Sequence, residues 1–257
     1  MSVRIAVLGL GEAGGEIARD LVALGADVRG FDPLVEPPPG VAPRAGDADA
    51  VRDADLVLSV NSAHDAVPAL SASLEALAPG TIWADLNTAA PAVKAALVRL
   101  ATDVSIVDVA LMAPVPGRGL RTPMLASGAA AGQFAEILGG LGADVTVQPG
   151  PAGEASARKL LRSVFYKGLA AAVVEALTAA EAAGCAEWLR GNISAELAGF
   201  DHRTIDRLVD GTHAHARRRA DEMSAASEHL RDLGVEPRVA AAARDLLIAL
   251  RDGEAPS

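Results

Sequence analysis

Apolar residues in the first part of the chain occur as short runs that alternate with stretches of helical periodicity. Val3–Leu8 and Ala26–Phe31 are short runs that predict buried strands, and Ala13–Leu24 repeats apolar positions as an amphipathic helix does. The same alternation predicts further strands at Leu56–Val60, Thr81–Asp85, Val104–Val109, Met124–Ser127 and Asp144–Gln148, and further helices at Ala66–Leu77, Pro91–Ala101 and Ala130–Leu141. Strands that alternate with helices in this way predict a mostly parallel sheet covered on both faces.

Two segments interrupt this alternation. Pro33–Gly46 is rich in proline and glycine, and we expect no regular structure in it. After Gln148–Gly153 almost no β-rich run remains, which predicts a long helix at Glu154–Ala183. Several more helices should follow, with breaks at Gly184, Gly191, Gly211 and Gly234. The predicted fold class is therefore α/β: a Rossmann-type doubly wound sheet at residues 1–150, then an all-helical domain for substrate binding and dimerisation at residues 151–257.

Composition excludes several classes of function. The chain has 257 residues, is 51% hydrophobic and 22% charged, and carries a formal net charge of −10. This charge and a 3% aromatic content argue against nucleic-acid binding, since a polyanion is repelled and base stacking needs aromatic rings. The single cysteine, Cys185, excludes a disulfide framework. No signal peptide and no membrane-spanning run is recognised, so we expect a cytoplasmic protein.

A glycine-rich loop joins the first predicted strand to the first predicted helix. Its sequence, Gly9-Leu10-Gly11-Glu12-Ala13-Gly14, has the GxGxxG spacing of loops that bind the pyrophosphate of a dinucleotide. Asp32 ends the second predicted strand, where a carboxylate can accept hydrogen bonds from ribose hydroxyls. Val60 and Asn61 end the next strand at the same crevice. The alternative is an ordinary strand–helix turn followed by a loop aspartate.

Asp32 also bears on which dinucleotide is bound. A carboxylate about 4 Å from a 2′-phosphate costs on the order of 4 kcal/mol per unit charge near a protein surface. NADP would need an arginine to offset this repulsion, and neither Arg29 nor Arg44 is well placed in the sequence to do so. We therefore expect NAD in preference to NADP.

A lysine follows the predicted domain junction on the long helix. Ser163, Tyr166 and Lys167 lie four, seven and eight residues after Lys159 and so share its helix face. A lysine beside an oxidised nicotinamide ring would have its pKa lowered, which suits it to exchange a proton with a substrate hydroxyl. The alternative is a solvated polar stripe.

Four segments together resemble the β-hydroxyacid dehydrogenase superfamily, which includes 3-hydroxyisobutyrate and 6-phosphogluconate dehydrogenases. They are the GLGEAG loop, Asp85-Leu-Asn-Thr88-Ala-Ala-Pro91, Ala113-Pro114-Val115-Pro116-Gly117, and the stretch from Gly150 to Lys159. The resemblance covers nearly the whole chain, and its second half is most similar to a branch with a phosphogluconate-dehydrogenase-like C-terminal domain. It implies that Lys159 is the general acid and base and that Asn87 and Thr88 lie near nicotinamide and substrate.

Three departures from the family pattern change the expected substrate. Pro116 replaces the substrate-binding serine, so a hydroxyl and an N–H donor are lost together. Ser163 replaces an asparagine, and Tyr166 replaces an acidic group. The substrate is therefore expected to be neither of the two named hydroxyacids, and decarboxylation is not supported.

Several further residues are candidates for binding an anionic substrate. In the loop after Pro116 and Gly117, Arg118 and Arg121 can form a fork for a carboxylate, although an ordinary solvated loop explains them equally well. His215 and Arg218 can face the active site, including that of a partner subunit. No metal site is predicted, because His213 and His215 would point about 200° apart on a helix.

We therefore expect an NAD(P)-dependent oxidoreductase that transfers a hydride between nicotinamide and a small hydroxy acid or its carbonyl partner. It should be a homodimer, because so apolar a long helix needs a covering partner. Two alternatives remain open: a dinucleotide-sensing protein without turnover, and a Rossmann-type methyltransferase. Trp83 and Trp188 are expected to be packing residues, and Cys185 is expected to be a buried thiol.

Overall fold

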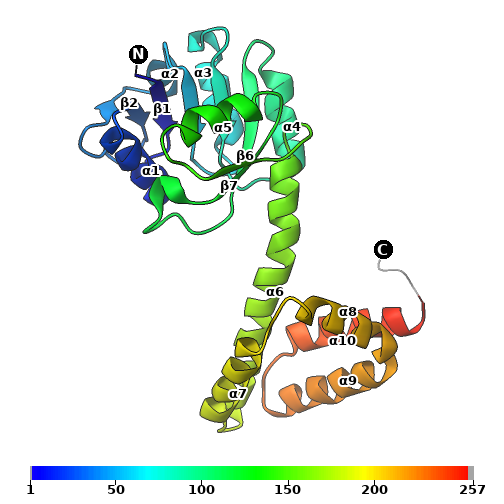
Figure 1. The fold of residues 1–257 in the computed structure, drawn as a ribbon. Coiled ribbons are helices and arrows are strands. Elements are labelled where there is room, and N and C mark those ends of the chain that lie inside the picture. The colour runs from blue at the N-terminus through cyan, green and yellow to red at the C-terminus, as the bar shows by residue number, and fades with distance from the viewer. Residues whose placement is uncertain (1, 254–257) are drawn as a thin grey trace. The chain divides into compact units, whose positions relative to one another are not determined.

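The computed structural model describes residues 2–253. It divides after Arg162 into two compact units. The first unit, which Figure 1 draws from blue to light green, contains an eight-stranded sheet. The strand order is β3-β2-β1-β4-β5-β6-β7-β8. Its strands are β1 Arg4–Leu8, β2 Asp27–Phe31, β3 Ala42–Pro43, β4 Leu56–Ser59, β5 Ile82–Asp85, β6 Ser105–Leu111, β7 Met124–Ser127 and β8 Val145–Val147. β6 and β7 pair antiparallel and the other neighbours pair in parallel, so the predicted fold class is confirmed.

Helices cover both faces of this sheet. Successive residues of a strand point to opposite faces, and in the central strands both sets of residues are apolar. Ile5 and Val7 of β1 face a core shared with α1 and α5, while Ala6 and Leu8 face a second core shared with α2, α3 and α4. The helices of this unit are α1 Glu12–Ala23, α2 Asp47–Val51, α3 Ala66–Ser73, α4 Pro91–Leu100 and α5 Ala131–Gly139, with 3₁₀ turns η1 Leu74–Ala76 and η2 Gly119–Arg121.

The segment predicted to be irregular contains a short strand. β3 lies inside Pro33–Gly46 and pairs with β2, so that prediction is wrong. Pro43 is tolerated because β3 forms the edge of the sheet, where no further strand needs its missing N–H group. The short helix α2, which follows directly, was not predicted either.

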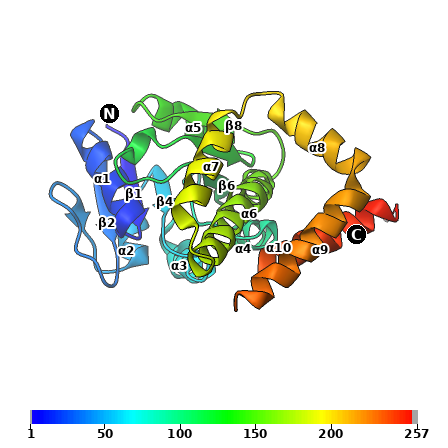
Figure 2. The ribbon, with the colours of Figure 1, turned by 90° about the horizontal axis from the view of Figure 1, so that it is seen from below.

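The second unit consists of helices. α6, Glu154–Ala182, crosses the division between the units and is followed by α7 Ala186–Ala198, α8 Thr204–Ala214, α9 Ala216–Asp232 and α10 Arg238–Arg251. α9 and α10 run side by side (Figure 2). Glu175 of α6 accepts hydrogen bonds of 2.8 Å from the N–H groups of Val239 and Ala240 and so caps α10. Within the described residues, no helix is long and apolar enough to cross a membrane.

Some predictions for the second unit are wrong. Gly184 and Gly234 do follow helix ends and have positive φ angles, but Gly191 and Gly211 lie inside α7 and α8. Trp83, which lies in β5 of the first unit, is buried as expected, whereas Trp188 is 68% exposed and Cys185 is exposed. Among the described residues of this unit, most of the buried apolar side chains are alanines, and no residue of α7 is buried.

Candidate active site

The glycine loop connects β1 to α1 with the geometry that a phosphate-binding turn requires. Gly9 has a φ of +90°, and a Cβ atom on it would lie 2.5 Å from the carbonyl oxygen of Val60. A Cβ on Gly14 would lie 1.9 Å from the carbonyl oxygen of Gly9, so the start of α1 packs directly on the loop. A Cβ on Gly11 would meet nothing within 4 Å. The loop is therefore tight on the protein side and open at the N-terminus of α1, where N–H groups can face a phosphate.

Asp32 holds the loop against the end of β2. One carboxylate oxygen accepts a 2.7 Å hydrogen bond from the N–H of Leu10, and the other accepts from the N–H groups of Leu34 and Val35 at 2.8 and 3.0 Å. These three donors hold the carboxylate in one orientation beside the loop.

A cleft of about 350 Å³ opens beside the loop. Its acidic lining residues are Asp32, Asp47 and Asp65, and burial raises the pKa of Asp47. No lysine or arginine is among the residues that line it in the described part of the chain. The cleft is also lined by Gly9, Gly11, Val60 and Asn61, all of which were predicted to bind cofactor. The remaining predicted residues of the loop, Glu12 and Ala13, form the first turn of α1.

Asn87 follows β5 and presents a buried acceptor without a partner. Its Nδ2 atom donates to the hydroxyl of Ser59 at 3.0 Å and to the carboxylate of Asp85. Because Asp85 can only accept here, the amide orientation is fixed and Oδ1 is left without a hydrogen bond, although Asn87 is only 4% exposed. A buried acceptor of this kind can accept a hydrogen bond from a bound group or from water.

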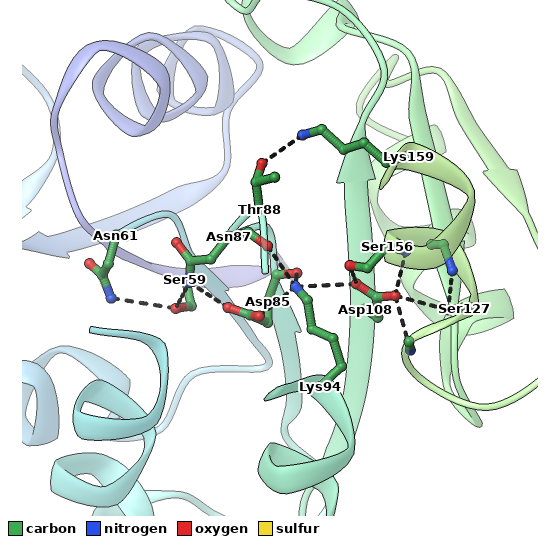
Figure 3. Close-up of polar contacts among 12 residues, drawn as sticks. Ser59, Asn61, Asp85, Asn87, Thr88, Lys94, Asp108, Ser127, Ser156 and Lys159 are labelled. Atoms are coloured by element: carbon green, nitrogen blue, oxygen red, sulfur yellow. Dashed lines mark hydrogen bonds and ion pairs between the residues drawn. The ribbon is translucent and has the colours of Figure 1, made fainter. Parts of the chain in front are cut away.

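Lys159 and Thr88 are brought together. The amine of Lys159 donates a 2.8 Å hydrogen bond to the hydroxyl of Thr88, across 71 positions of sequence (Figure 3). Thr88 directly follows Asn87, and the side chain of Lys159 is partly exposed. A primary amine, a hydroxyl and an unpartnered amide oxygen thus come from adjacent positions of the fold, which is a set of groups suited to proton transfer at a polar substrate.

A buried charged cluster lies next to Asn87 and was not predicted from the sequence. Lys94 of α4 is fully buried and contacts the carboxylates of Asp85 at 2.5 Å and of Asp108 at 3.2 Å. Asp85 and Asp108 are direct neighbours in the parallel register of β5 and β6. The available signal was one aspartate within each of two apolar strands and one lysine within an apolar helix, since buried charges of this kind must be paired.

The loop at residues 116–121 lies against α1. The N–H of Gly117 donates to Glu16 and the N–H of Leu120 donates to Asp20, both at 2.8 Å. Pro116, Gly117, Arg118 and Arg121 are exposed on this loop. Their role in substrate binding therefore stays a prediction.

The other candidates belong to the second unit. Ser163 and Tyr166 continue α6, and the ring of Tyr166 meets that of Phe165 edge to face with centroids 5.2 Å apart. His215 lies between α8 and α9, and Arg218 pairs with Glu222 one turn later at 3.5 Å. Their roles also stay predictions.

Comparisons with known proteins identify both parts of the chain. Residues 4–146 match the NAD binding domain of 6-phosphogluconate dehydrogenase, and residues 180–250 match a domain of unknown function, DUF1932. A conserved hypothetical protein from Sinorhizobium meliloti 1021 is 30% identical, with 97% of this chain and 88% of that one covered and a TM-score of 0.62.

Two further solved structures are similar. MTH1747, a conserved protein described as structurally similar to 3-hydroxyacid dehydrogenases, is 27% identical, with 98% and 100% of the two chains covered and a TM-score of 0.63. A reductive aminase from Aspergillus terreus, solved with NADPH and ethyl levulinate, is 18% identical, with 99% and 95% covered and a TM-score of 0.79. This last similarity shows the shared fold. The predicted resemblance and the dinucleotide-binding domain are confirmed.

Proposed function

The chain belongs to the family that carries the NAD-binding domain of 6-phosphogluconate dehydrogenase, and from this premise we propose that it is an NAD(P)-dependent oxidoreductase. The proposed substrate is a small hydroxy acid or its carbonyl partner, with Lys159 as general acid and base. The observation that carries the proposal is the 2.8 Å contact between the Lys159 amine and the Thr88 hydroxyl, beside the unpartnered Oδ1 of Asn87.

The residues around the cleft fit a dinucleotide. The open backbone at Gly11 admits a pyrophosphate, Asp32 accepts from ribose hydroxyls, and Asn87, which is not among the described residues that line the cleft, offers its Oδ1 to a donor such as an amide or a hydroxyl. When bound, the nicotinamide cofactor supplies or accepts the hydride. Lys159 takes up the proton of the substrate hydroxyl during oxidation and returns it to the carbonyl oxygen during reduction. Thr88 holds the amine of Lys159 in place for this transfer.

NAD is the proposed cofactor in preference to NADP. Three carboxylates line the cleft, and three backbone N–H groups prevent Asp32 from turning away. A 2′-phosphate placed about 4 Å from that carboxylate would be repelled by roughly 4 kcal/mol per unit charge at an effective dielectric near 20. Arg29 and Arg44 are absent from the lining of the cleft, so neither offsets this repulsion.

A homodimer is the proposed assembly. Val164, Phe165 and Val174 of α6 have side chains 74%, 55% and 65% exposed, and Trp188 of α7 is 68% exposed. Apolar surface of this extent on one helix pair is typical of an interface. Sedimentation equilibrium should give a dimer that Val164→Glu dissociates, and a monomer at all concentrations would contradict this proposal.

The test of the function is a turnover screen that follows NADH absorbance. It offers NAD⁺ with small hydroxy acids, NADH with keto acids, and NADH with carbonyl–amine pairs, the last because a reductive aminase shares the fold. Lys159→Met should lower turnover about 10²- to 10⁴-fold without loss of NADH binding, as removal of a general acid does. Lys167→Met is the matched control, since Lys167 is an exposed lysine two turns further along the same helix.

Two outcomes would contradict the proposal. Equal turnover of Lys159→Met and wild type would remove Lys159 from the mechanism. NADH binding without turnover of any substrate would favour the second candidate, a dinucleotide-sensing protein. That candidate is supported by Pro116, which stands where the family has a substrate-binding serine.

A further inference from the structure

The buried charged cluster joins two neighbouring strands to a helix. The amine of Lys94 contacts the carboxylates of Asp85 and Asp108 and also donates to the backbone carbonyls of Asp85 and Asn87, at 3.0 and 2.8 Å. The side chains of all three charged residues are 0% exposed. Lys94 thus holds β5, β6 and the segment after β5 that carries Asn87 in one arrangement.

The same cluster fixes where α6 begins. Asp108 accepts hydrogen bonds from the backbone N–H groups of Gly153 and Ser156, at 3.0 and 2.9 Å, and from the Ser156 hydroxyl at 2.6 Å. Ser127 of β7 accepts from the N–H of Ala155 at 3.0 Å. The first N–H groups of a helix have no partner within the helix, and here residues of β6 and β7 supply that partner. The sheet, not a local cap, therefore sets the position of the first turn of α6.

Together with the covalent chain, these contacts form a closed ring that includes Lys159, the proposed proton donor, and we call this ring the circuit (Figure 3). One arm runs from Lys94 to the carbonyl of Asn87 and so to its neighbour Thr88. The other arm runs from Lys94 through Asp108 to Ser156, one helical turn before Lys159. The two arms meet where the amine of Lys159 donates to Thr88.

We propose that Lys94 and Asp108 are positioning residues: through Asn87 and Ser156 they place the Lys159 amine at Thr88. This inference rests on the proposed function, in which Lys159 exchanges the proton. A cluster that only stabilised the fold would change the melting temperature when weakened and would leave the environment of the Lys159 amine unchanged.

Lysine labelling can separate these two roles without any substrate. The chain contains three lysines, Lys94, Lys159 and Lys167, so acetylation by an N-hydroxysuccinimide ester can be followed for each by peptide mass spectrometry. Lys167 is the internal reference. The test variant is Ser156→Ala, which removes one hydrogen bond to Asp108 and leaves all charges in place. The matched control is Ser73→Ala, because Ser73 is also fully buried and its hydroxyl donates to the carbonyl of Ala69, outside the circuit.

In Ser156→Ala the labelling rate of Lys159 relative to Lys167 should rise about threefold or more, as expected from the loss of roughly one hydrogen bond. In Ser73→Ala the ratio should stay at the wild-type value even where the melting temperature falls equally. If Ser156→Ala does not fold, Ser127→Ala is the second variant, because it removes the parallel link from Asp108 through the Ser127 hydroxyl to the N–H of Ala155, and it should give the same rise. An unchanged ratio in the folded variant overturns the positioning role. Failure of the proposed function is seen separately, in the turnover of Lys159→Met.

Discussion

Replacing Lys94 by methionine tests the energetic account of the buried cluster. Methionine fills most of the volume of the lysine stem but leaves Asp85 and Asp108, both fully buried, without the cation between them. Removing one partner of a buried ion pair typically costs about 3–5 kcal/mol, because a charge is left without compensation. Of the two aspartates, Asp85 should be destabilised more by the loss of the cation, since Asp108 keeps its hydrogen bonds from Gly153, Ser156 and Ser127.

Urea unfolding followed by far-ultraviolet circular dichroism measures this loss. In a thermal unfolding experiment on a chain of this size, a loss of 3–5 kcal/mol in the free energy of unfolding corresponds to a fall of about 6–20 °C in the melting temperature. The double variant Lys94→Met/Asp85→Asn removes both members of the shorter pair and should recover a large part of the loss, giving a coupling energy of about 1 kcal/mol or more between the two sites. A loss below about 1 kcal/mol in Lys94→Met would refute the claim that this lysine compensates two buried charges.

Three further predictions concern the glycine loop, the cofactor cleft and the ion pair between Arg4 and Asp55. Asp32→Asn should raise the affinity for NADPH relative to NADH about tenfold or more, because one repelling charge is removed; isothermal titration would contradict this if the ratio did not change. Gly14→Ala should lower both the melting temperature and NADH affinity, because its Cβ would lie 1.9 Å from a backbone oxygen. Gly11→Ala, whose Cβ meets no protein atom within 4 Å, should lower NADH affinity alone; equal melting temperatures of these two variants would refute the difference. The guanidinium of Arg4 hydrogen-bonds Asp55 and lowers its pKa, so this pair stabilises the fold above the unfolded pKa and loses that effect as the pH falls through the folded pKa. Asp55→Asn should therefore lose less stability than wild type below about pH 4, and parallel acid-unfolding curves would show that the pair contributes nothing.

The sequence predicts the parts of the fold that depend on local pattern. β1, α1 and the loop between them follow from an apolar run, a helical period and three glycines. In the structure Gly9 and Gly14 have no room for a Cβ atom, whereas a Cβ on Gly11 would meet no protein atom within 4 Å. Local pattern was misleading where tertiary context decides. Pro43 joins the sheet because it lies at an edge, and Gly191 and Gly211 remain inside helices.

The candidate site shows the same division. Lys159 and Thr88 could be predicted because each belongs to a recognisable motif, and the structure brings them to 2.8 Å. Lys94 could not be assigned to Asp85 and Asp108, because their proximity depends on the register of β5 and β6 and on how α4 packs over them. A single charged residue in an apolar segment is a signal that a partner exists, but it does not say which residue that partner is.

We propose above that this chain binds a nicotinamide dinucleotide at the Gly9–Gly14 loop, with NAD preferred to NADP. The most direct measurement is a paired titration with NADH and NADPH that follows nucleotide fluorescence and energy transfer from tryptophan. We expect saturable binding of both, with NADH the tighter by about tenfold or more, since Asp32, Asp47 and Asp65 line the cleft and would repel a 2′-phosphate. Tighter binding of NADPH would contradict the role of Asp32, and binding of neither nucleotide would contradict dinucleotide binding at the glycine loop.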